Sequence, residues 1–215
     1  MLARPVLAAA LLGIGLVLTP ASSSGREVID RVLAVVSGEI VTQSDVQGAL
    51  ALGLVDGADA ADPVAAGLHE LIDRALILAE VRRFAPTEPS ATEVEERVDE
   101  MRRRFGSAAA LTQALAASGI DAERLRLLAR DDLGMKAYLA ERFAGSPQPS
   151  DQQIDDYVRA QQKTPVRDGR TLSLEEARDL ARQQLADQRR QASIADWIGD
   201  LRRRADITEL YPSRR

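Results

Sequence analysis

The chain has 215 residues, with 28 basic and 33 acidic side chains, a formal net charge of −5, one histidine and no cysteine. The lack of cysteine excludes disulfides, a lipid-modified cysteine and every cysteine-based metal site or nucleophile. Because the charge is mildly acidic, nothing global attracts nucleic acid. Aromatic residues make up only 3% of the chain, so the core must be built from Leu, Val, Ile and Ala, which suits closely packed helices.

Residues 1–25 have the organisation of a secretory signal peptide. Arg4 supplies a positive start, Val6 to Leu18 is an uninterrupted apolar stretch of 13 residues, and a small, polar segment with Pro20 follows. Spanning a bilayer takes about 20 apolar residues, so this stretch is short for a retained anchor. We expect cleavage near Ala21 to Gly25 and a soluble mature protein in an exported, periplasmic compartment; a retained leader is the alternative.

A β-hairpin is predicted directly after the leader. Val32 to Val36 is an apolar run rich in β-branched residues, Ser37-Gly38 can supply a two-residue turn, and Glu39 to Thr42 forms the returning strand. A helix follows, and two capping boxes compete for its start: Ser44 with Gln47, or Thr42 with Asp45. In either case, a small strand pair leads into a helix.

Three helices with apolar stripes come next. The first has apolar residues every three or four positions, as a core helix requires: Val64, Leu68, Leu71, Ala75 and Leu78. The second begins at a capping box of Ser90 and Glu93, is stopped by Gly106, and has the stripe Val94, Val98, Met101 and Phe105. The third is short and rich in alanine, ends at Ser118-Gly119, and is marked by Leu111 and Leu115.

A longer helix is expected from a cap at Asp121 toward Phe143. Its apolar face is less regular than the earlier ones and consists of Leu128, Met135, Leu139 and Phe143. Asp132 occupies the missing position on this face, and Gly134 weakens the middle of the helix. We therefore expect a bend or a polar contact at this point.

The second half of the chain contains the clearest linker and the longest helix. Two capping boxes mark helix starts there: Ser150 with Gln153, and Ser173 with Glu176. The first helix is brief and reaches about Gln162, after which segment 163–173 is polar and contains Pro165 and Gly169. The second is about thirty residues long, and one side carries Leu174, Ala177, Ala181, Leu185, Ala192, Ala195, Ile198 and Leu201, with Trp197 beside them. Because tertiary packing stabilises such a helix more than propensity does, we expect it to lie against the earlier helices and not to project alone. Ile207 to Tyr211 alternates like a final short strand that pairs with the early hairpin.

Four segments carry a resemblance to a known family. They are D-R-V-x-A-V-V from Asp30 with Ser44-Asp45 behind it, L-I-D-R-A-L-I-L-A-E from Leu71 to Glu80, A-x-S-G-I-D from Ala116 to Asp121, and W-I-x-x-L-R-R-R-A-x-I from Trp197 to Ile207. In this order, behind a signal peptide, they resemble SurA-type periplasmic chaperones over most of the mature chain. The resemblance implies a mainly α fold, in which a helical module (26–162) and a C-terminal helix and strand (174–215) form one chaperone core with a small antiparallel β element.

The chain departs from that family between the two parts. SurA-type chaperones carry parvulin-type prolyl isomerase domains there, whereas this chain has only the linker 163–173. Parvulin sites also use histidines, and the single histidine here, His69, lies inside the first stripe helix. Isomerase activity is therefore not implied, and we expect no enzyme.

The residues offer no other catalytic, cofactor or metal chemistry. His69 has no cysteine to activate and no G-x-S-x-G motif to serve, so we interpret it as a partly buried structural histidine. A metal site would need carboxylates alone, and the densest group is Glu93, Glu95, Glu96, Asp99 and Glu100. We interpret this group as a solvated helix face with i, i+4 ion pairs: Glu93 with Arg97, Asp99 with Arg103 and Glu100 with Arg104. No cofactor and no metal are expected.

Arginine runs suggest nucleic-acid binding at first sight. They are Arg102 to Arg104, Arg189-Arg190 and Arg202 to Arg204. The acidic total, the export signal and the absence of interleaved aromatic residues favour salt-bridged helix surfaces instead, because phosphate binding needs a face that is basic as a whole. We expect no nucleic-acid partner.

The predicted function depends on apolar surface. Eight residues are candidates for a peptide-binding groove, each with ordinary core packing as the alternative: Met101, Phe105, Leu111, Leu115, Leu128, Met135, Leu139 and Phe143. The resemblance implies an ATP-independent periplasmic holdase for unfolded polypeptides, outer-membrane proteins in particular, without stable membrane insertion after leader cleavage. A non-catalytic assembly partner that holds one fixed protein is the alternative, and a prolyl isomerase by family label ranks third.

Overall fold

Helices dominate the chain, and a small sheet joins segments near its two ends. The computed structural model describes residues 30–57, 59–84, 87–161, 166–167 and 170–212, so the predicted leader lies outside the described residues. In chain order the elements are β1 (Val32–Val36), β2 (Glu39–Thr42), α1 (Gln43–Ala51), α2 (Pro63–Phe84), α3 (Ala91–Arg104), α4 (Ala108–Ser118), α5 (Ala122–Arg142), α6 (Asp151–Ala160), β3 (Val166–Arg167), β4 (Arg170–Thr171), α7 (Leu174–Arg204) and β5 (Ile207–Glu209). The predicted mainly α fold with a small antiparallel β element is confirmed. Within the predicted linker, β3 and β4 pair with each other, and residues 163–165 and 168–169 lie outside the described ranges.

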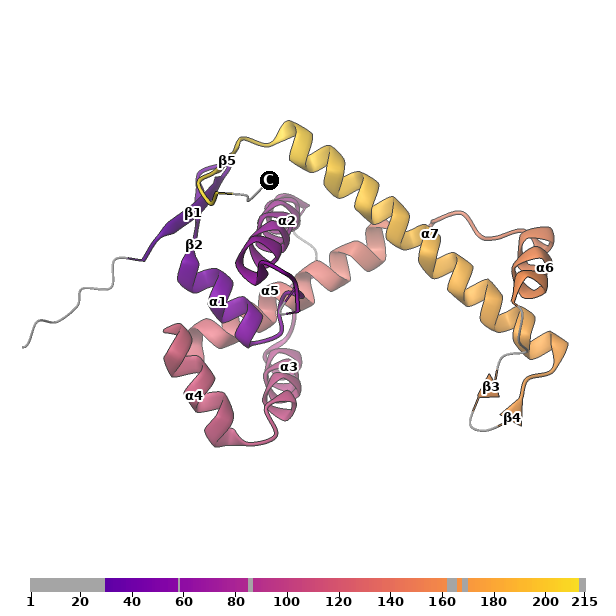
Figure 1. Ribbon diagram of the computed structural model, residues 1–215, viewed down its shortest axis with the longest axis horizontal. Coiled ribbons are helices and arrows are strands. Elements are labelled where there is room, and N and C mark those ends of the chain that lie inside the picture. The colour runs from indigo at the N-terminus through magenta and orange to yellow at the C-terminus, as the bar shows by residue number, and fades with distance from the viewer. Residues whose placement is uncertain (1–29, 58, 85–86, 162–165, 168–169, 213–215) are drawn as a thin grey trace, which may run out of the picture.

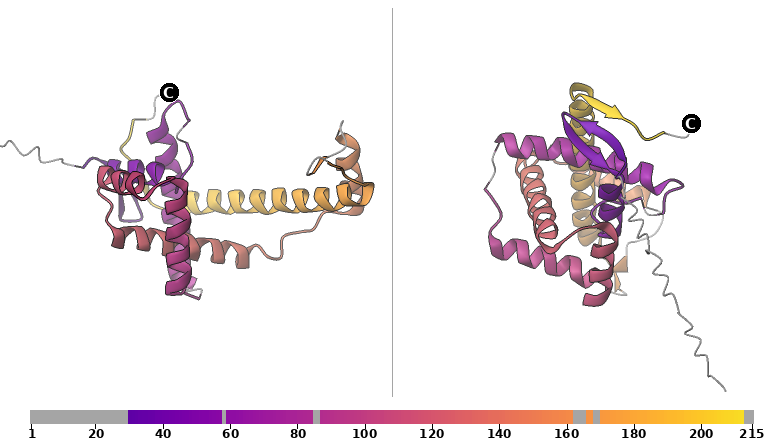
Figure 2. Two further views of the ribbon diagram at one scale, coloured as in Figure 1. Left: turned by 90° about the horizontal axis from the view of Figure 1, so that it is seen from below. Right: turned by 90° about the vertical axis from the view of Figure 1, so that its left-hand side faces the viewer.

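The molecule has two parts, which we name the head and the arm (Figure 1). The head comprises β1, β2, β5, α1 to α5 and the part of α7 from residue 194 onward. The arm comprises α6, the β3–β4 pair and the part of α7 up to residue 190. Figure 2 shows α7 extending well beyond the head, with α6 beside its far end. One helix therefore belongs to both parts.

The sheet has the strand order β2-β1-β5, and both outer strands are antiparallel to β1. Ser37 and Gly38 have φ angles of 50° and 89°, and two successive positive values are what the tight turn of a two-residue hairpin needs. β5 pairs with β1 through Val36 opposite Ile207 and Ala34 opposite Glu209. The predicted pairing of the last strand with the early hairpin is confirmed.

Side-chain caps start the helices where the sequence indicates. The Asp45 carboxylate accepts a hydrogen bond from Thr42 N at 3.0 Å, and Thr42 Oγ1 accepts one from Asp45 N at 3.3 Å, so Thr42, and not Ser44, caps α1. Capping boxes also start α3, α6 and α7: Ser90 with Glu93, Ser150 with Gln153, and Ser173 with Glu176. Asp121 caps α5, and Gly119 ends α4 at a φ of 66°, a left-handed conformation that glycine adopts without strain.

Two apolar clusters fill the head. The larger lies between the sheet, α2, α5 and the end of α7, and its buried members are Leu33, Ala34, Val36, Val41, Val46, Leu68, Ile72, Leu76, Ile77, Met135, Tyr138, Trp197 and Leu201. The smaller lies between the end of α1 and α3, α4 and α5, and its buried members are Leu52, Val94, Val98, Met101, Leu111, Leu125 and Ala129. Each fully buried Leu, Ile or Met contributes about 1.5–3 kcal/mol, so the head has most of the hydrophobic stabilisation.

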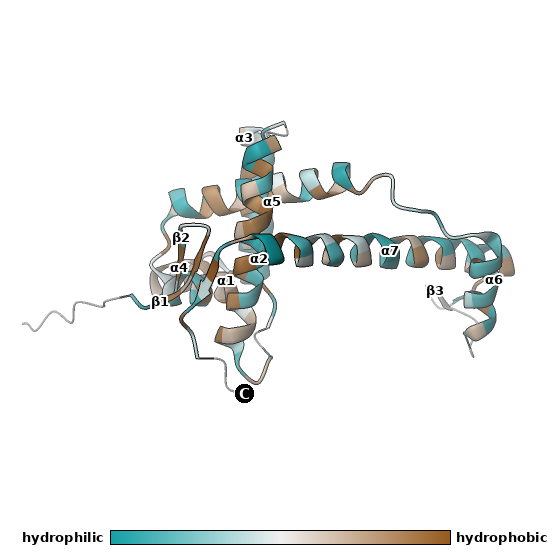
Figure 3. Ribbon diagram, turned by 90° about the horizontal axis from the view of Figure 1, so that it is seen from above, coloured by the Kyte–Doolittle hydropathy of each residue, from teal (hydrophilic) through white to brown (hydrophobic). Residues whose placement is uncertain are grey.

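α7 lies against earlier helices in two places, α2 in the head and α6 in the arm, so the prediction that it would pack on them is confirmed in part. Only the C-terminal part packs on the head, where Trp197 and Leu201 are buried. Leu174 is 70% exposed, and Ala192 and Ala195 are exposed as well. Figure 3 shows hydrophilic residues turn after turn along the arm. The apolar side of α7 is thus buried toward its two ends and not along its whole length.

The arm has a small contact surface of its own. α6 lies on α7, with Ile154 fully buried and Ala177 and Ala181 buried on α7. The guanidinium of Arg189 donates to the carbonyl oxygens of residues 147 and 148, at 3.3 and 2.7 Å. These bonds hold the segment that enters α6 against α7. The preceding helix α6 therefore supplies the cover that the head does not give.

Candidate functional site

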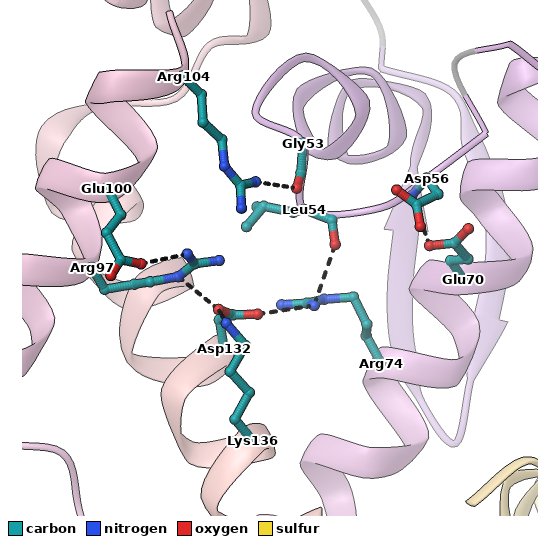
Figure 4. Close-up of polar contacts among 10 residues, drawn as sticks. All are labelled: Gly53, Leu54, Asp56, Glu70, Arg74, Arg97, Glu100, Arg104, Asp132 and Lys136. Atoms are coloured by element: carbon teal, nitrogen blue, oxygen red, sulfur yellow. Dashed lines mark hydrogen bonds and ion pairs between the residues drawn. The ribbon is translucent and has the colours of Figure 1, made fainter. Parts of the chain in front are cut away.

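A buried cluster of charges joins three helices of the head (Figure 4). Asp132 of α5 accepts a hydrogen bond from Arg97 Nε of α3 at 2.8 Å. The same carboxylate lies 2.9 Å from Lys136 Nζ and 3.5 Å from Arg74 Nη1 of α2. The side chains of Asp132 and Arg97 are each only 9% exposed. The polar contact expected at Asp132 is confirmed.

The position of Asp132 fixes its charge. Burial alone would raise the pKa of this carboxyl, but the Lys136 ammonium and the Arg97 guanidinium outweigh burial and hold the pKa below its usual range. The carboxylate is therefore ionised, and both of its oxygens are engaged by cations of the chain. We assign the cluster a structural role, since none of its acceptor atoms is free for a ligand.

The arginines of α3 do not form the predicted i, i+4 pairs. Glu93 is used in the capping box, Asp99 pairs with Arg102 at 2.6 Å, and Arg97 turns inward. Arg104 reaches a carbonyl oxygen of the loop after α1. Spacing along one helix cannot identify partners on other helices, and the buried partner of Arg97 interacts more strongly than an exposed one would.

The cluster also fixes that loop. Arg104 Nη1 donates to Gly53 O at 3.1 Å, and Arg74 Nη1 donates to Leu54 O at 3.4 Å (Figure 4). Arg74 therefore binds the loop and Asp132 at once. Because Arg74 also lines the cleft described next, the charge cluster supports one wall of that cleft.

An open cleft of about 230 Å³ lies between β2, α1, α2, the end of α4 and α5. Half of its eighteen lining residues are apolar: Ile40, Val41, Ala49, Leu54, Leu71, Ala75, Leu78, Ile120 and Leu128. Six charged residues also line it: Glu39, Asp45, Arg74, Arg82, Arg124 and Asp131. The three acidic and three basic side chains balance, so the cleft combines apolar surface with no net charge.

Most of these charges already have partners within the chain. Arg82 Nη1 lies 3.4 Å from the Glu39 carboxylate, Asp45 caps α1, and Arg74 faces Asp132. Asp131 is half-buried in the cleft wall, where burial raises its pKa against the opposing effect of the nearby arginines. A charged occupant would thus meet no strong opposite field in the cleft.

Ile40 gives the cleft its most exposed apolar side chain. It sits on β2, the outer strand of the sheet, and is 56% exposed. The residues on either side of it, Glu39 and Val41, line the cleft as well. An exposed isoleucine at a sheet edge beside an apolar cleft is a feature typical of a binding surface.

The eight predicted groove residues do not form one groove. Met101 and Leu111 are buried in the smaller cluster, with Phe105, Leu115 and Leu128 packed around it. Met135 is buried in the larger cluster, with Leu139 and Phe143 against it. Of the eight, Leu128 lines the cleft.

Sequence patterns missed most of the cleft lining. Leu71 and Leu78 were assigned to the core stripe of α2, Ile40 to the hairpin, and Ile120 to the turn before α5. Each of these assignments describes the backbone correctly and says nothing about exposure. The neighbouring apolar residues Ile40 and Val41 carried the one usable signal, because successive side chains of a strand point to opposite faces and only one of the two can face the core.

Aromatic side chains gather at the opposite end of α5. The Phe143 and Tyr138 rings lie 5.7 and 6.0 Å from Trp197, and Phe84 stacks on Tyr138 at 6.2 Å. The Arg142 guanidinium lies 4.9 Å above the Trp197 ring. This group explains why Phe143 is not in the cleft: it helps to attach the end of α7 to the head.

His69 lies at the surface of the head. His69 has a side chain that is 54% exposed, 3.8 Å from the Glu209 carboxylate, so the expectation of a partly buried histidine is wrong. Over the described ranges, no group of three or more His, Cys, Asp or Glu residues is placed to hold a metal ion. None of the helices in these ranges is both long and apolar enough to span a membrane.

Neither protein-family models nor curated proteins give a match to this chain. The resemblance to SurA-type chaperones therefore stays a prediction that depends on the quoted segments. Any functional conclusion depends on the geometry of the head.

Proposed function

We propose that this chain is an ATP-independent holdase of the periplasm, which binds unfolded polypeptides, outer-membrane proteins in particular, and releases them by mass action. The observation that supports this most is the open, half-apolar cleft without net charge between β2, α1, α2, α4 and α5. A holdase needs adaptable apolar surface and few fixed polar demands, so that segments of different sequence bind weakly. The cleft meets this need, because its charges balance and most of them have partners.

The cleft replaces the eight-residue groove as the proposed binding site. Ile40, Leu71, Leu78, Ile120 and Leu128 come from four separate parts of the head, so a bound segment would contact all of them at once. Behind this surface, the ion pairs of Asp132 with Arg74 and Arg97 join α5 to α2 and α3. A rigid wall with an exposed apolar rim suits binding without a conformational switch.

Aggregation of an unfolded β-barrel protein tests the proposal. The mature chain, at a stoichiometric ratio, is expected to slow light scattering after dilution of the client from denaturant. Ile40→Gln removes apolar contact at the rim and should weaken this activity about ten-fold or more, since burying one such side chain contributes about 1.5–3 kcal/mol and each 1.4 kcal/mol is about ten-fold.

The matched control is Leu174→Gln, which changes an apolar residue of the arm that is 70% exposed. It should leave the activity as it is. A wild-type chain without effect on aggregation, or equal losses in both variants, would contradict the proposal. The single-partner alternative is distinguished by affinity capture from periplasm: a holdase retains many unrelated proteins, and an assembly partner retains one at fixed stoichiometry. A clear acceleration of prolyl isomerisation would instead support an enzyme.

A further inference from the structure

The outer edge of β2 faces away from the sheet with its backbone groups unpaired by any described strand. Ser37 N donates to Asp206 O at 2.7 Å, and Leu33 O accepts from Leu210 N at 2.8 Å, so the backbone N–H and C=O groups of the odd-numbered residues of β1 point toward β5. The backbone groups of the even-numbered residues therefore point toward β2. Val36 and Glu39, which flank the turn, therefore form a hydrogen-bonded pair, and so do Ala34 and Val41.

It follows that Ile40 directs its N–H and C=O away from β1. Its partner Val35 pairs toward β5, and β2 ends the strand order of this sheet. The next outward N–H, that of Thr42, is taken by the Asp45 carboxylate at 3.0 Å. Ile40 is thus the residue of β2 that offers a donor and an acceptor to another strand, and it does so where β2 lines the cleft.

The two edges of the sheet differ in what lies beside them. On the inner side of β5, Leu210 N and Tyr211 N both donate to Leu33 O of β1, at 2.8 and 3.1 Å, and of the two outer strands only β2 lines the cleft. At the β2 edge, the Glu39–Arg82 ion pair marks one end, and the α1 cap marks the other. Edge strands are commonly protected by proline, lysine or a bulge, and β2 contains neither Pro nor Lys, while the irregularity lies in β1 between Val32 and Ala34. Between these two ends, the outward N–H and C=O of Ile40 have no neighbouring strand among the described residues.

We propose that an extended, uncharged polypeptide segment adds to β2 as a further strand, pairing with the N–H and C=O of Ile40 and placing alternate side chains in the cleft. This proposal depends on the proposed holdase function and names the class of segment bound there. Backbone pairing gives affinity without a demand for particular side chains, which is how a single site serves many unfolded sequences.

The charge and shape of the cleft select the occupant. The lining holds three acidic and three basic side chains, and the pairs of Glu39 with Arg82 and of Arg74 with Asp132 are internal. The remaining lining charges that can interact with an occupant, Arg124 and Asp131, are opposite in sign and interact with each other, so a charged side chain entering the cleft would lose hydration without meeting a net opposite charge. Because strand side chains alternate, one side of the segment faces the apolar floor and the other faces water. Segments that alternate apolar and polar residues, as in strands with one wet face, therefore fit best.

N-methylated peptides test strand addition on the wild-type protein. The probe is a fluorescent, uncharged peptide about eight residues long with alternating Val and Thr, measured by anisotropy. Two further versions carry N-methyl groups on the Val residues only or on the Thr residues only, which block opposite edges. If a strand adds to β2, one methylated version should bind up to about ten-fold more weakly and the other like the parent, since the methyl group removes the peptide donor to the Ile40 carbonyl oxygen and obstructs that edge.

Two substitutions at Ile40 locate the edge. Ile40→Pro and Ile40→Ala both shorten the side chain, but only proline removes the outward N–H, and an edge position of this kind accepts proline without loss of a ladder bond. Ile40→Pro should bind the parent peptide about ten-fold more weakly than Ile40→Ala. If Ile40→Pro fails to fold, as judged by its thermal melt, the peptide comparison on the wild type decides alone.

The outcomes separate this proposal from the proposed function. Equal binding of both methylated peptides, or equal binding by folded Ile40→Pro and Ile40→Ala, overturns strand addition at β2. A wild-type chain that slows client aggregation but does not bind the parent peptide overturns it as well, and the holdase proposal then stands. A wild-type chain that does neither overturns both.

Discussion

The head and the arm share one helix but are held together by different means. In the head, α7 contributes Trp197 and Leu201 to a large apolar cluster, and β5 closes the sheet. In the arm, the same helix packs on α6 through Ile154 and small alanines, and Arg189 and Glu176 form polar contacts with the segments before and after α6. Charged pairs on the surface surround this contact, such as Arg178 with Asp155 at 3.1 Å. Surface pairs of this kind contribute little.

A helix that is continuous, as α7 is, need not be equally stable along its length. The residues of α7 in the head can unfold only when the core opens, whereas those in the arm can separate from α6 locally. The cleft lies in the head, and a long helix carries the arm away from it (Figure 2). The proposed binding site therefore lies in the part of the molecule with the larger core.

Removing the second half of the chain should have the largest effect. A chain that ends at Gln162 loses β5 from the edge of β1 and loses Trp197 and Leu201 from the larger cluster. We expect the remaining helices to aggregate and to lack a cooperative thermal transition. A soluble fragment with a sharp melt would instead show that the head folds without α7.

The buried charge cluster should give the largest effect of a single substitution. Asp132→Asn leaves the exposed Glu100 carboxylate, 2.9 Å from Arg97 Nη1, as the remaining counter-charge of the buried Arg97, and should lower the free energy of unfolding by up to about 3–5 kcal/mol, measured by urea denaturation. Asp131→Asn, at the adjacent position, is the control. Since burial already raises the pKa of Asp131, neutralising this residue should cost little or should stabilise. Similar losses in both variants would show that the cluster does not support the head.

Local signals in the sequence identified the starts of helices and the sheet pairing, because caps and strand alternation act over a few residues. Ser90, Asp121 and Ser173 are examples, and each caps its helix in the structure. Tertiary choices were not predictable in this way. Leu174 fits the same stripe as Leu201, yet one is exposed and the other is buried, since periodicity shows which side of a helix is apolar and not what covers it.

The candidate site was harder to predict than the fold. Asp132 was recognisable as a polar residue on an apolar face, but its partners lie on α2 and α3, far away in sequence. The cleft combines residues from separate elements whose other neighbours are core. Of the predicted groove, Leu128 alone was placed there, because the exposure of an apolar side chain depends on the arrangement of whole helices.

Loosening the arm should leave the head intact. Ile154→Ala removes the fully buried side chain of α6 and should destabilise the arm locally by about 2–5 kcal/mol, seen as faster amide exchange in α6 and the first half of α7. The urea midpoint of the head, followed by Trp197 fluorescence, should not move. Leu174→Ala is the control, since this side chain is 70% exposed. A matching shift of the Trp197 signal in Ile154→Ala would show that arm and head unfold as one unit.

Acid should affect the arm through the start of α7, and this is the smallest expected effect. Bidentate contact with Arg170, at 2.6 and 3.0 Å, and a hydrogen bond from Ser173 N lower the pKa of Glu176 from 4.5 to about 2. A carboxyl with a lowered pKa stabilises the folded form above its ordinary pKa, and this contribution is lost as the pH falls from about 4.5 toward 2. Amide chemical shifts at Ser173 and Glu176 should therefore titrate with a midpoint near 2, while Glu176→Gln, whose amide oxygen can still accept from Ser173 N, should abolish the transition. Because the group is at the surface, the Trp197 signal of the head should not follow this titration, and a wild-type midpoint near 4.5 would show that Arg170 does not hold the carboxylate in solution.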